Sequence, residues 1–407
     1  MSWMTGLYRF PPIFAAGGYR ASFFDVDGNR YIDFNVADLS MTMGYGPAAI
    51  VEAVARAVQG GAHFLLPTED AVVVAENLAL RVGIPHWQFT LSASGAIAEV
   101  MRIARVMTGR QKLLVFEGHY HGHVDETLVA RTPSGGSIAD LMGTAAGSAD
   151  NTIVVPFNDL DAVEASLSGG GVALVLTEPA LTNCTLVKPE PGFLTGLREL
   201  TEKHGTLLCY DEAHTFQFAY GGLVGEWRLA TDFVVLGKGF GSGISFALYG
   251  MSDAVAAEFV RHSDIDIGPK GIATGGTIYG SAVAAAAARA SLERMLTRDA
   301  YARLATLGDR LADGLERIFH DRGLPWRAHR LGPRAGFCLM PELPKTGAQA
   351  CCSIIPEFID TRRVYMANRG LWDAVASAGP QASLAHAADD IDRYVASAGD
   401  FLAEITG

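Results

Sequence analysis

The chain has 407 residues, of which 49% are hydrophobic and 19% are charged, so it is long enough to bury a large core. Its 32 Lys and Arg residues against 44 Asp and Glu give a net charge of −12, and we expect neither nucleic acid nor an anionic membrane as a partner. The start of the chain lacks the basic residues and the apolar run of a signal peptide, and the five cysteines form no CxxC pair. These features predict a cytoplasmic protein.

The predicted elements begin with a hairpin. Residues 23–34, FFDVDGNRYIDF, are typical of two short strands joined by Asp27-Gly28, a strong turn signal. Helices are predicted over 48–60 and 68–83. From residue 88 onward, short apolar runs alternate with amphipathic helices, which indicates an α/β domain with a largely parallel sheet. The predicted strands are 89–94, 112–118, 152–157, 172–179, 206–212 and 232–239.

The last part of the chain has a different pattern. An alanine-rich helix is predicted over 281–297, and a second long helix follows residue 300. Irregular segments and a final amphipathic helix over 389–405 complete the chain. This pattern favours a smaller α+β domain.

Polar residues follow five of the predicted strands, at the point where each strand ends. In open α/β sheets, ligands bind beyond the carboxyl ends of the strands, so we expect these residues to meet in one cleft. In chain order they are Ser94-Gly95-Ala96, Glu117 with His119-Tyr120-His121, Glu178-Pro179, Asp211-Glu212-Ala213-His214 and Lys238.

Ser94-Gly95-Ala96 stands at the predicted start of a helix. The first N–H groups of a helix have no intrahelical partner and the helix dipole attracts an anion, so this start suits a phosphate group. A serine in such a place is also typical of a plain helix N-cap. The motif alone leaves both interpretations open.

Asp211 ends an apolar strand, where a buried carboxylate needs a cationic partner. Taken alone, it fits a structural salt bridge or a helix cap as well as a functional role. Lys238 stands at the end of the next predicted strand. Together they indicate a division of labour in which the lysine forms an imine with a carbonyl cofactor and the carboxylate keeps a pyridinium nitrogen protonated.

Lys238 lies in the glycine-rich stretch VVLGKGFGSGIS, residues 234–245. This stretch fails the dinucleotide-binding pattern GxGxxG because Ser242 replaces the third glycine, and it fails the Walker pattern because Gly239 follows the lysine. The glycines are better explained as room for a lysine that is bonded to a planar ring. A nicotinamide oxidoreductase and a non-catalytic binding protein stay as rival interpretations.

The segment EGHYHGH, residues 117–123, carries histidines at alternate positions, and three imidazoles can bind zinc. However, the segment offers no clear carboxylate partner for each ring. Tyr120 fits an aromatic platform under a planar cofactor equally well. We therefore predict no metal.

Several motifs in one order are similar to a known family. They include FFDVDGNRYIDF, KLLVFEGHYHGH, TLLCYDEAHTF, LGKGFGSGIS and GGTIYGS. With these motifs the chain resembles, from about residue 12 to its C-terminus, the class III aminotransferases of the fold type I pyridoxal-phosphate (PLP) enzymes, and among them the glutamate-1-semialdehyde aminomutase branch.

The resemblance implies an α/β fold with three parts. A large PLP-binding domain, residues 46–290, would hold a mostly parallel, mixed seven-stranded sheet flanked by helices. A smaller α+β domain, residues 291–407, would pack with an N-terminal segment, residues 1–45. The cofactor would be pyridoxal 5′-phosphate, and the active unit would be a homodimer.

The resemblance also implies roles for single residues. Lys238 would form the Schiff base with the cofactor, and Asp211 would pair with its ring nitrogen. The expected cofactor-binding residues are Ser94, Gly95, Ala96, Tyr120, Glu178, Asn183, Asp211, Ala213, His214, Lys238 and Thr277. Among them, Tyr120 and Ala213 would cover the two ring faces, and Thr277 would reach the phosphate in the neighbouring subunit.

The implied reaction is the transfer of an amino group from an amine or amino acid to a carbonyl acceptor, a keto acid or an aldehyde. An aminomutase reaction, or another reaction at Cα such as racemisation or decarboxylation, is the alternative on the same scaffold. The chain departs from the family pattern at Ala96, where threonine is usual, and near Gln217, where an arginine is common. Arg20, Arg334 and Arg369 are the spare candidates for a substrate carboxylate. We therefore expect a substrate other than glutamate 1-semialdehyde.

Overall fold

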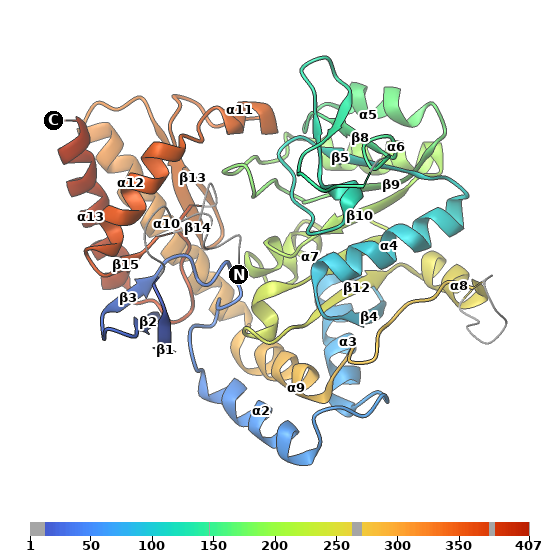
Figure 1. Ribbon diagram of the computed structural model, residues 1–407, viewed down its shortest axis with the longest axis horizontal. Helices are drawn as coiled ribbons and strands as arrows, with labels where there is room; N and C mark the ends of the chain where they lie inside the picture. Colours follow the sequence, from blue (N-terminus) through green and yellow to red (C-terminus); the bar gives the residue numbers. More distant parts are fainter. Residues whose placement is uncertain (1–12, 146, 263–270, 374–378, 407) are drawn as a thin grey trace.

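A seven-stranded sheet forms the centre of the larger unit in the computed structural model, which describes residues 13–145, 147–262, 271–373 and 379–406. The strands run in the order β4-β12-β11-β10-β9-β5-β8, and only β12 is antiparallel to its neighbours (Figure 1). Their bounds are β4 His86–Thr90, β5 Lys112–Phe116, β8 Thr152–Val155, β9 Val172–Thr177, β10 Leu207–Asp211, β11 Phe233–Leu236 and β12 Ala247–Met251.

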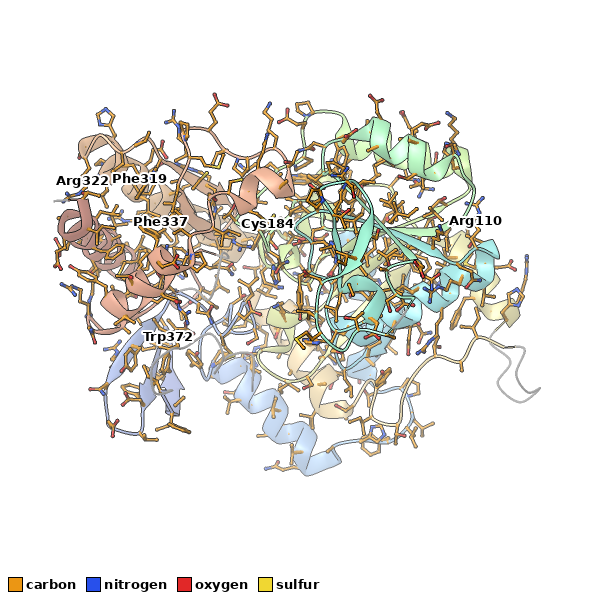
Figure 2. The ribbon with its side chains drawn as sticks, turned by 45° about the horizontal axis from the view of Figure 1, so that its top comes forward. Arg110, Cys184, Phe319, Arg322, Phe337 and Trp372 are labelled. Carbon is orange, nitrogen blue, oxygen red and sulfur yellow. The ribbon has the colours of Figure 1, made fainter. Side chains whose placement is uncertain are left out.

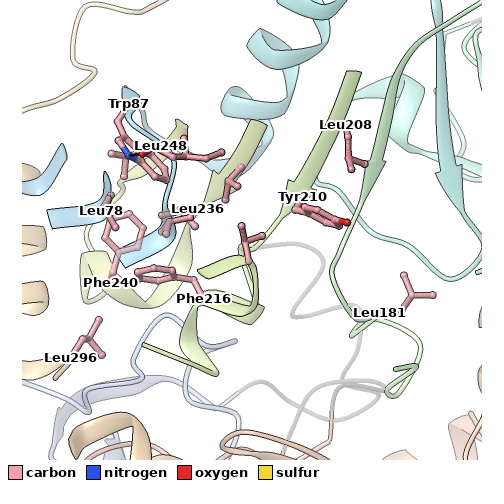
Figure 3. Packing of buried hydrophobic residues seen from close by; sticks show 14 of the residues in the cluster. Leu78, Trp87, Leu181, Leu208, Tyr210, Phe216, Leu236, Phe240, Leu248 and Leu296 are labelled. Carbon is pink, nitrogen blue, oxygen red and sulfur yellow. Dashed lines mark hydrogen bonds between the residues drawn. The ribbon is translucent and has the colours of Figure 1, made fainter. Parts of the chain in front are cut away.

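Helices cover both faces of this sheet because its central strands are apolar on both sides. Leu208 and Tyr210 of β10 pack into one cluster of buried residues, whereas Cys209 between them packs into another. The first cluster (Figure 3) involves α2 Ala48–Gly60, α3 Glu69–Val82, α5 Leu160–Leu167, α6 Phe193–His204, α7 Gly222–Trp227 and α9 Ala282–Ala290. The second involves α4 Ala93–Thr108 and α8 Asp253–His262.

The smaller unit joins both ends of the chain. Its helices are α10 Arg298–Asp321, α12 Pro356–Ala367 and α13 Ala388–Thr406, and its hairpin is β13 Arg327–Leu331 with β14 Arg334–Cys338. A second sheet holds β1 Ala15–Tyr19, β2 Ser22–Asp25, β3 Arg30–Asp33 and β15 Leu371–Trp372. Because β15 pairs with β3, the N-terminal strands become part of the C-terminal unit. Phe319 and Phe337 meet in its core at a ring distance of 5.6 Å (Figure 2).

The remaining elements are short. They are the hairpin of β6 Val129–Arg131 with β7 Ser137–Ala139, the helix α11 Gly347–Cys351, and single turns of 3₁₀ helix. No helix within the described ranges is both long enough and apolar enough to cross a membrane.

Three sequence-based expectations about elements differ from the structure. The strand predicted over 89–94 lies at His86–Thr90, because the helix after it begins earlier than expected. The helix predicted over 281–297 ends at Ala290 and continues as a π-helical turn, Ser291–Met295. The seventh strand, β12, lies outside the six predicted runs. The core of the larger unit also extends past residue 290, since Leu304 of α10 packs into it. The N-terminal segment can be described only from residue 13, and the C-terminal unit only without 374–378 and 407.

Candidate active site

A cavity of about 320 Å³ opens at the carboxyl ends of the parallel strands. It lies where the loops after β4, β5, β9, β10 and β11 meet, as expected for an open α/β sheet. Eight of the expected site residues line it, and they are Ser94, Tyr120, Glu178, Asn183, Asp211, Ala213, His214 and Lys238. The other lining residues are Ser40, Leu91, Ser92, Ala93, His121, Gly122, Gly243, Ile244, Ser245 and Phe246.

Asp211 is held in the cavity wall by two hydrogen bonds. Its Oδ2 lies 2.8 Å from Nδ1 of His121, and its Oδ1 accepts the N–H of Ala213 at 3.0 Å. Both partners of the His121–Asp211 pair are buried. A carboxylate that is fixed in this way can face a protonated ring nitrogen without reorganising.

Lys238 follows β11 and begins a 3₁₀ turn, Lys238–Gly241. Its φ of 60° is left-handed, a conformation that side chains with a Cβ seldom adopt and that is often kept at functional sites. Its neighbours are glycines because the space is small: a Cβ on Gly237 would lie 3.3 Å from Cβ of Ala93, and one on Gly239 would lie 2.9 Å from the Leu39 carbonyl oxygen. The glycines therefore serve close packing around the lysine.

The helix α4 begins at the cavity, and its start differs from the expected one. Ser92 is the N-cap, and its Oγ accepts the N–H of Gly95 at 3.1 Å. The N–H of Ala96 donates to the Ser92 carbonyl at 3.0 Å. The helix amides before this bond are those of Ala93, Ser94 and Gly95, and the Gly95 amide is used by the cap. The N–H of Ala96, which was expected to hold a phosphate, is thus already used within the helix, and neither Gly95 nor Ala96 lines the cavity.

Ser94 still reaches the cavity, and the loop after β5 packs closely on it. Its Oγ accepts the N–H of His123 at 3.0 Å. Gly122 must be glycine here, because its φ is 83° and a Cβ would lie 2.1 Å from the Ser94 Oγ. The N-terminus of α4 and this loop together form a narrow pocket that suits an anion.

Ser92→Ala is expected to weaken cofactor binding by up to about fivefold, because the cap fixes the first turn of α4 and its loss costs about 1 kcal/mol. Titration of the apoenzyme with cofactor, followed by absorbance, measures the change. Thr297→Ala is the matched control, since Thr297 caps α10 in the same way and does not line the cavity. Equal cofactor affinity in Ser92→Ala and the wild type would contradict this role of the α4 start.

Glu178 is hydrogen-bonded to Asn183 directly and to His214 through Thr182. The Thr182 Oγ1 donates to Oε2 of Glu178 and lies 2.6 Å from Nδ1 of His214, and Nδ2 of Asn183 donates to Oε1 of Glu178 at 3.2 Å. Burial raises the pKa of Glu178 above its ordinary value. Burial, together with the positive charge of Lys238, lowers the pKa of His214 well below its ordinary value. His214 is therefore a neutral group at physiological pH.

The histidines of the EGHYHGH segment are used separately. Nδ1 of His119 lies 2.7 Å from the Phe116 carbonyl, His121 pairs with Asp211, and His123 is exposed. Within the described ranges, no group of three or more His, Cys, Asp or Glu side chains could hold a metal ion.

The remaining expected residues do not line the cavity. Thr277 is exposed in a turn and does not line it. The three spare arginines do not line it either: Arg20 is exposed, Arg369 lies over the ring of Tyr365, and the buried Arg334 donates to the Thr182 carbonyl at 2.6 Å. Gln217 stands near the position where the family commonly has an arginine. The Nε2 of Gln217 donates to the Ala213 carbonyl at 2.9 Å.

Three residues and one role at or beside the site were not predicted from the sequence. Ser92 and Ala93 begin α4 in place of Ser94. His121 was expected in the cleft, but not as the partner of Asp211. Asp38 belongs to none of the motifs, although its Oδ2 lies 2.5 Å from the Lys238 Nζ. The sequence carried a signal for Ser92, because a serine three residues before Gly95 is itself a good N-cap.

The residues present fit pyridoxal phosphate. A helix start suited to a phosphate, a buried carboxylate that suits a protonated pyridine nitrogen, and a lysine amine all face one cavity. A fold of this type with this site defines a PLP-dependent enzyme of fold type I.

Comparisons with known proteins agree. The family model described as Aminotransferase class-III matches residues 10–333. The chain is 33% identical over 406 residues to a glutamate-1-semialdehyde 2,1-aminomutase of Bacillus subtilis (strain 168), covering 97% of this chain and 91% of the relative. The chain therefore belongs to the class III aminotransferase family, and its cofactor is pyridoxal 5′-phosphate.

Solved structures give the same result. A glutamate-1-semialdehyde-aminomutase from Pseudomonas aeruginosa PAO1 has a TM-score of 0.94 at 34% identity, over 99% of this chain and 90% of that chain. A lysine-to-alanine variant of such an aminomutase from the same organism, in complex with PMP, has the same TM-score and identity. An omega-transaminase from Sphaerobacter thermophilus has a TM-score of 0.90 at 28% identity, over 99% and 94% of the two chains.

Proposed function

We propose that the protein is an aminotransferase, which moves an amino group from an amine or amino acid to a carbonyl acceptor. The observation that carries the proposal is that Lys238 and Asp211, from the ends of two adjacent strands, face the same cavity. When bound, the cofactor supplies a carbonyl that condenses with amines and a ring that accepts the electrons released at the substrate Cα.

The chain contributes binding and proton transfer. The α4 start, with Ser92 and Ser94, binds the phosphate. Asp211, fixed by His121, holds the proton on the ring nitrogen. The Nζ of Lys238 carries a proton between the substrate Cα and the cofactor C4′, a step that a positioned acid–base group typically accelerates by about 10²–10⁴-fold.

Tyr120 and Ala213 are assigned to the two ring faces. Both line the cavity, and Tyr120 is 42% exposed, which leaves room for a planar ligand against it. Asn183 and His214 are assigned to the cofactor's 3′-oxygen, and Glu178 orients Asn183 directly and His214 through Thr182.

An aminomutase reaction is the second candidate, because relatives at 33–34% identity carry that name. It moves nitrogen within one molecule and needs no separate acceptor. Racemisation or decarboxylation at Cα is a third candidate on the same site. The cavity offers Lys238 as its only cationic side chain among the lining residues, which speaks against glutamate 1-semialdehyde, whose carboxylate needs a cationic partner.

The test is a screen of amine donors against keto acids and aldehydes with the purified holoenzyme. We expect stoichiometric formation of the aminated acceptor and the carbonyl product, and a stalled aminated enzyme when no acceptor is present. Turnover of glutamate 1-semialdehyde alone would identify an aminomutase. Inverted chirality or released CO₂ without amino transfer would identify the third candidate.

We also propose that the active unit is a homodimer, with Thr277 reaching the partner's cofactor phosphate. Large apolar side chains are exposed near this turn and on the segment before α3, including Ile278, Leu65 at 72% and Leu66 at 71%, and such exposure is typical of interfaces. The cysteines at positions 184, 209, 338, 351 and 352 are all unpaired with one another, which supports a reducing, cytoplasmic location.

A further inference from the structure

Asp38 lies directly beside the lysine of the site. Its Oδ2 is 2.5 Å from Nζ of Lys238, and its backbone carbonyl is 3.4 Å from the same nitrogen. The two side chains are 38% and 23% exposed, and of the two Lys238 lines the cavity, so Asp38 lies one hydrogen bond away from it. Although burial favours the protonated acid, the positive charge of Lys238 keeps the pKa of Asp38 below its ordinary value. The side chain is a carboxylate at neutral pH.

An unusual turn brings Asp38 to this place. Four consecutive residues without a glycine, Val36 to Leu39, have φ values of 52°, 45°, 53° and 68°. The left-handed conformation is disfavoured for every residue that has a Cβ, and a run of four persists only where the surroundings enforce it. Such strained segments concentrate at functional sites.

The surroundings that enforce the turn are a buried carboxylate and the lysine loop. Asp33 accepts the N–H groups of Asn35, Val36 and Ala37 at 2.9, 2.9 and 3.0 Å, and the hydroxyl of Tyr45 at 2.7 Å. On its other side, the Leu39 carbonyl packs against Gly239, next to Lys238. The turn and the lysine loop are thus fixed against each other.

The charge around the cavity changes once the lysine serves the cofactor. The described lining residues carry the carboxyls of Glu178 and Asp211 and one cation, Lys238. Asp211 is already paired with His121, and Glu178 with Thr182 and Asn183. When the Lys238 nitrogen is committed to the cofactor, the Asp38 carboxylate, which touches the cavity-lining Lys238 without lining the cavity itself, loses its ammonium partner, and the positive charge left near it is that of the buried Arg334. An ionised group in a partly buried place attracts a new counter-charge.

We propose that Asp38 determines substrate specificity by binding a second ammonium group of the amine donor, so that the enzyme prefers short diamines or amino compounds with a nearby second amine. This proposal rests on the proposed function, since the first amine of the donor is the one transferred. It names a substrate class that differs from the carboxylate-bearing amino acids.

The spacing of the two amines follows from the geometry. The transferred nitrogen takes the place of the Lys238 Nζ, which lies 2.5 Å from the Asp38 carboxylate. The second ammonium must therefore lie within a few ångströms of the first. A three-carbon spacer separates two amines by about 5 Å in extended form, given ordinary bond lengths, and can bend to less.

A substrate ammonium at Asp38 also helps Lys238. Once displaced from the cofactor, Lys238 must work as a neutral amine to accept a proton. A carboxylate without a partner would favour its ammonium form, whereas a carboxylate that already binds the substrate would not. Substrate binding and proton transfer are coupled in this way.

The test uses three donors of nearly equal length whose far ends differ in charge, namely 1,3-diaminopropane, 1-aminobutane and 3-aminopropanoate. Apparent Kd values are measured by calorimetry with the holoenzyme and the apoenzyme, and kcat/KM with an aldehyde acceptor. For the wild-type holoenzyme we expect the diamine to bind about tenfold more tightly than 1-aminobutane, and 3-aminopropanoate to bind most weakly. In the apoenzyme, where Lys238 occupies Asp38, the preference should shrink.

Variants of Asp38 test whether this side chain causes the preference for the diamine. Asp38→Asn, of the same shape, should reduce the difference between the diamine and 1-aminobutane to within about twofold, whereas Asp38→Glu should keep part of it. Asp27→Asn is the matched control, because Asp27 is exposed in the hairpin turn far from the cavity. Cofactor absorbance and circular dichroism check that each variant is folded and loaded.

Equal binding of the diamine and 1-aminobutane by the wild-type holoenzyme would overturn the proposal, whatever the variants do. So would a preference that survives in Asp38→Asn. If the diamine binds with the expected preference but no amino group is transferred to any acceptor, the proposed function fails while the role of Asp38 stands.

Discussion

Lys238→Ala is expected to lower amino transfer by at least about 10³-fold, because the variant loses both the covalent link to the cofactor and the amine that moves the proton. No other amine lines the cavity among the described residues, so no neighbouring side chain can substitute. The cofactor should still bind through the α4 start. Its absorbance should then be that of the free aldehyde, and borohydride should leave no pyridoxyl group on the chain.

Lys203→Ala serves as the control, because Lys203 is 63% exposed and pairs with Glu164 on the surface. It should retain wild-type turnover and the absorbance of the lysine-bound cofactor. A pyridoxyl adduct at any lysine other than Lys238 after borohydride treatment of the wild type would remove the basis of the assignment.

Asp211→Asn is expected to lower turnover by about 10²–10³-fold, the range typical of losing one preorganised electrostatic group. Asparagine has the same shape and can still meet His121, but it carries no negative charge to balance a protonated ring nitrogen. The electrons released at Cα are then poorly stabilised. Single-turnover kinetics with the donor should show a slower proton-removal step, with cofactor affinity changed much less.

The matched control for this variant is Asp161→Asn, which removes an exposed carboxylate in the first turn of α5. It should react at the wild-type rate. A wild-type rate in Asp211→Asn would show that the ring nitrogen does not depend on this carboxylate, and the assigned orientation of the cofactor would be wrong.

The sequence predicted site residues best where polar side chains stand at the carboxyl ends of predicted parallel strands. The alternation of apolar runs and helices predicted a parallel α/β sheet, and the carboxyl ends of its strands indicated Lys238, Asp211 and Glu178 without knowledge of any contact. This works because a parallel sheet brings all those ends to one edge. The family resemblance correctly added the fold type, the seventh strand and the cofactor.

The start of α4 and the role of Asp38 were not predicted, for two different reasons. Ser92 and Ser94 are both plausible N-caps, and only the packing of Gly122 and Gly237 against the turn shows that the helix begins at Ala93. Asp38 lies 200 residues from Lys238 in the sequence. Its left-handed turn contains no glycine, so the sequence gives no sign of the turn. Long-range contacts and enforced backbone strain leave no local pattern.

The strand order has a consequence for how the protein is made. In the described sheet β4 pairs only with β12, so residues 86–90 cannot join the sheet until residues 247–251 have left the ribosome. Since α4 begins just after β4, the phosphate pocket stays unformed during most of synthesis. A nascent chain that stalls before β12 would expose an unpaired edge and an apolar helix face, the kind of intermediate that aggregates or recruits chaperones. Pyridoxal 5′-phosphate can therefore stabilise the larger unit only after β12 has been synthesised, because its phosphate pocket is not formed in shorter fragments.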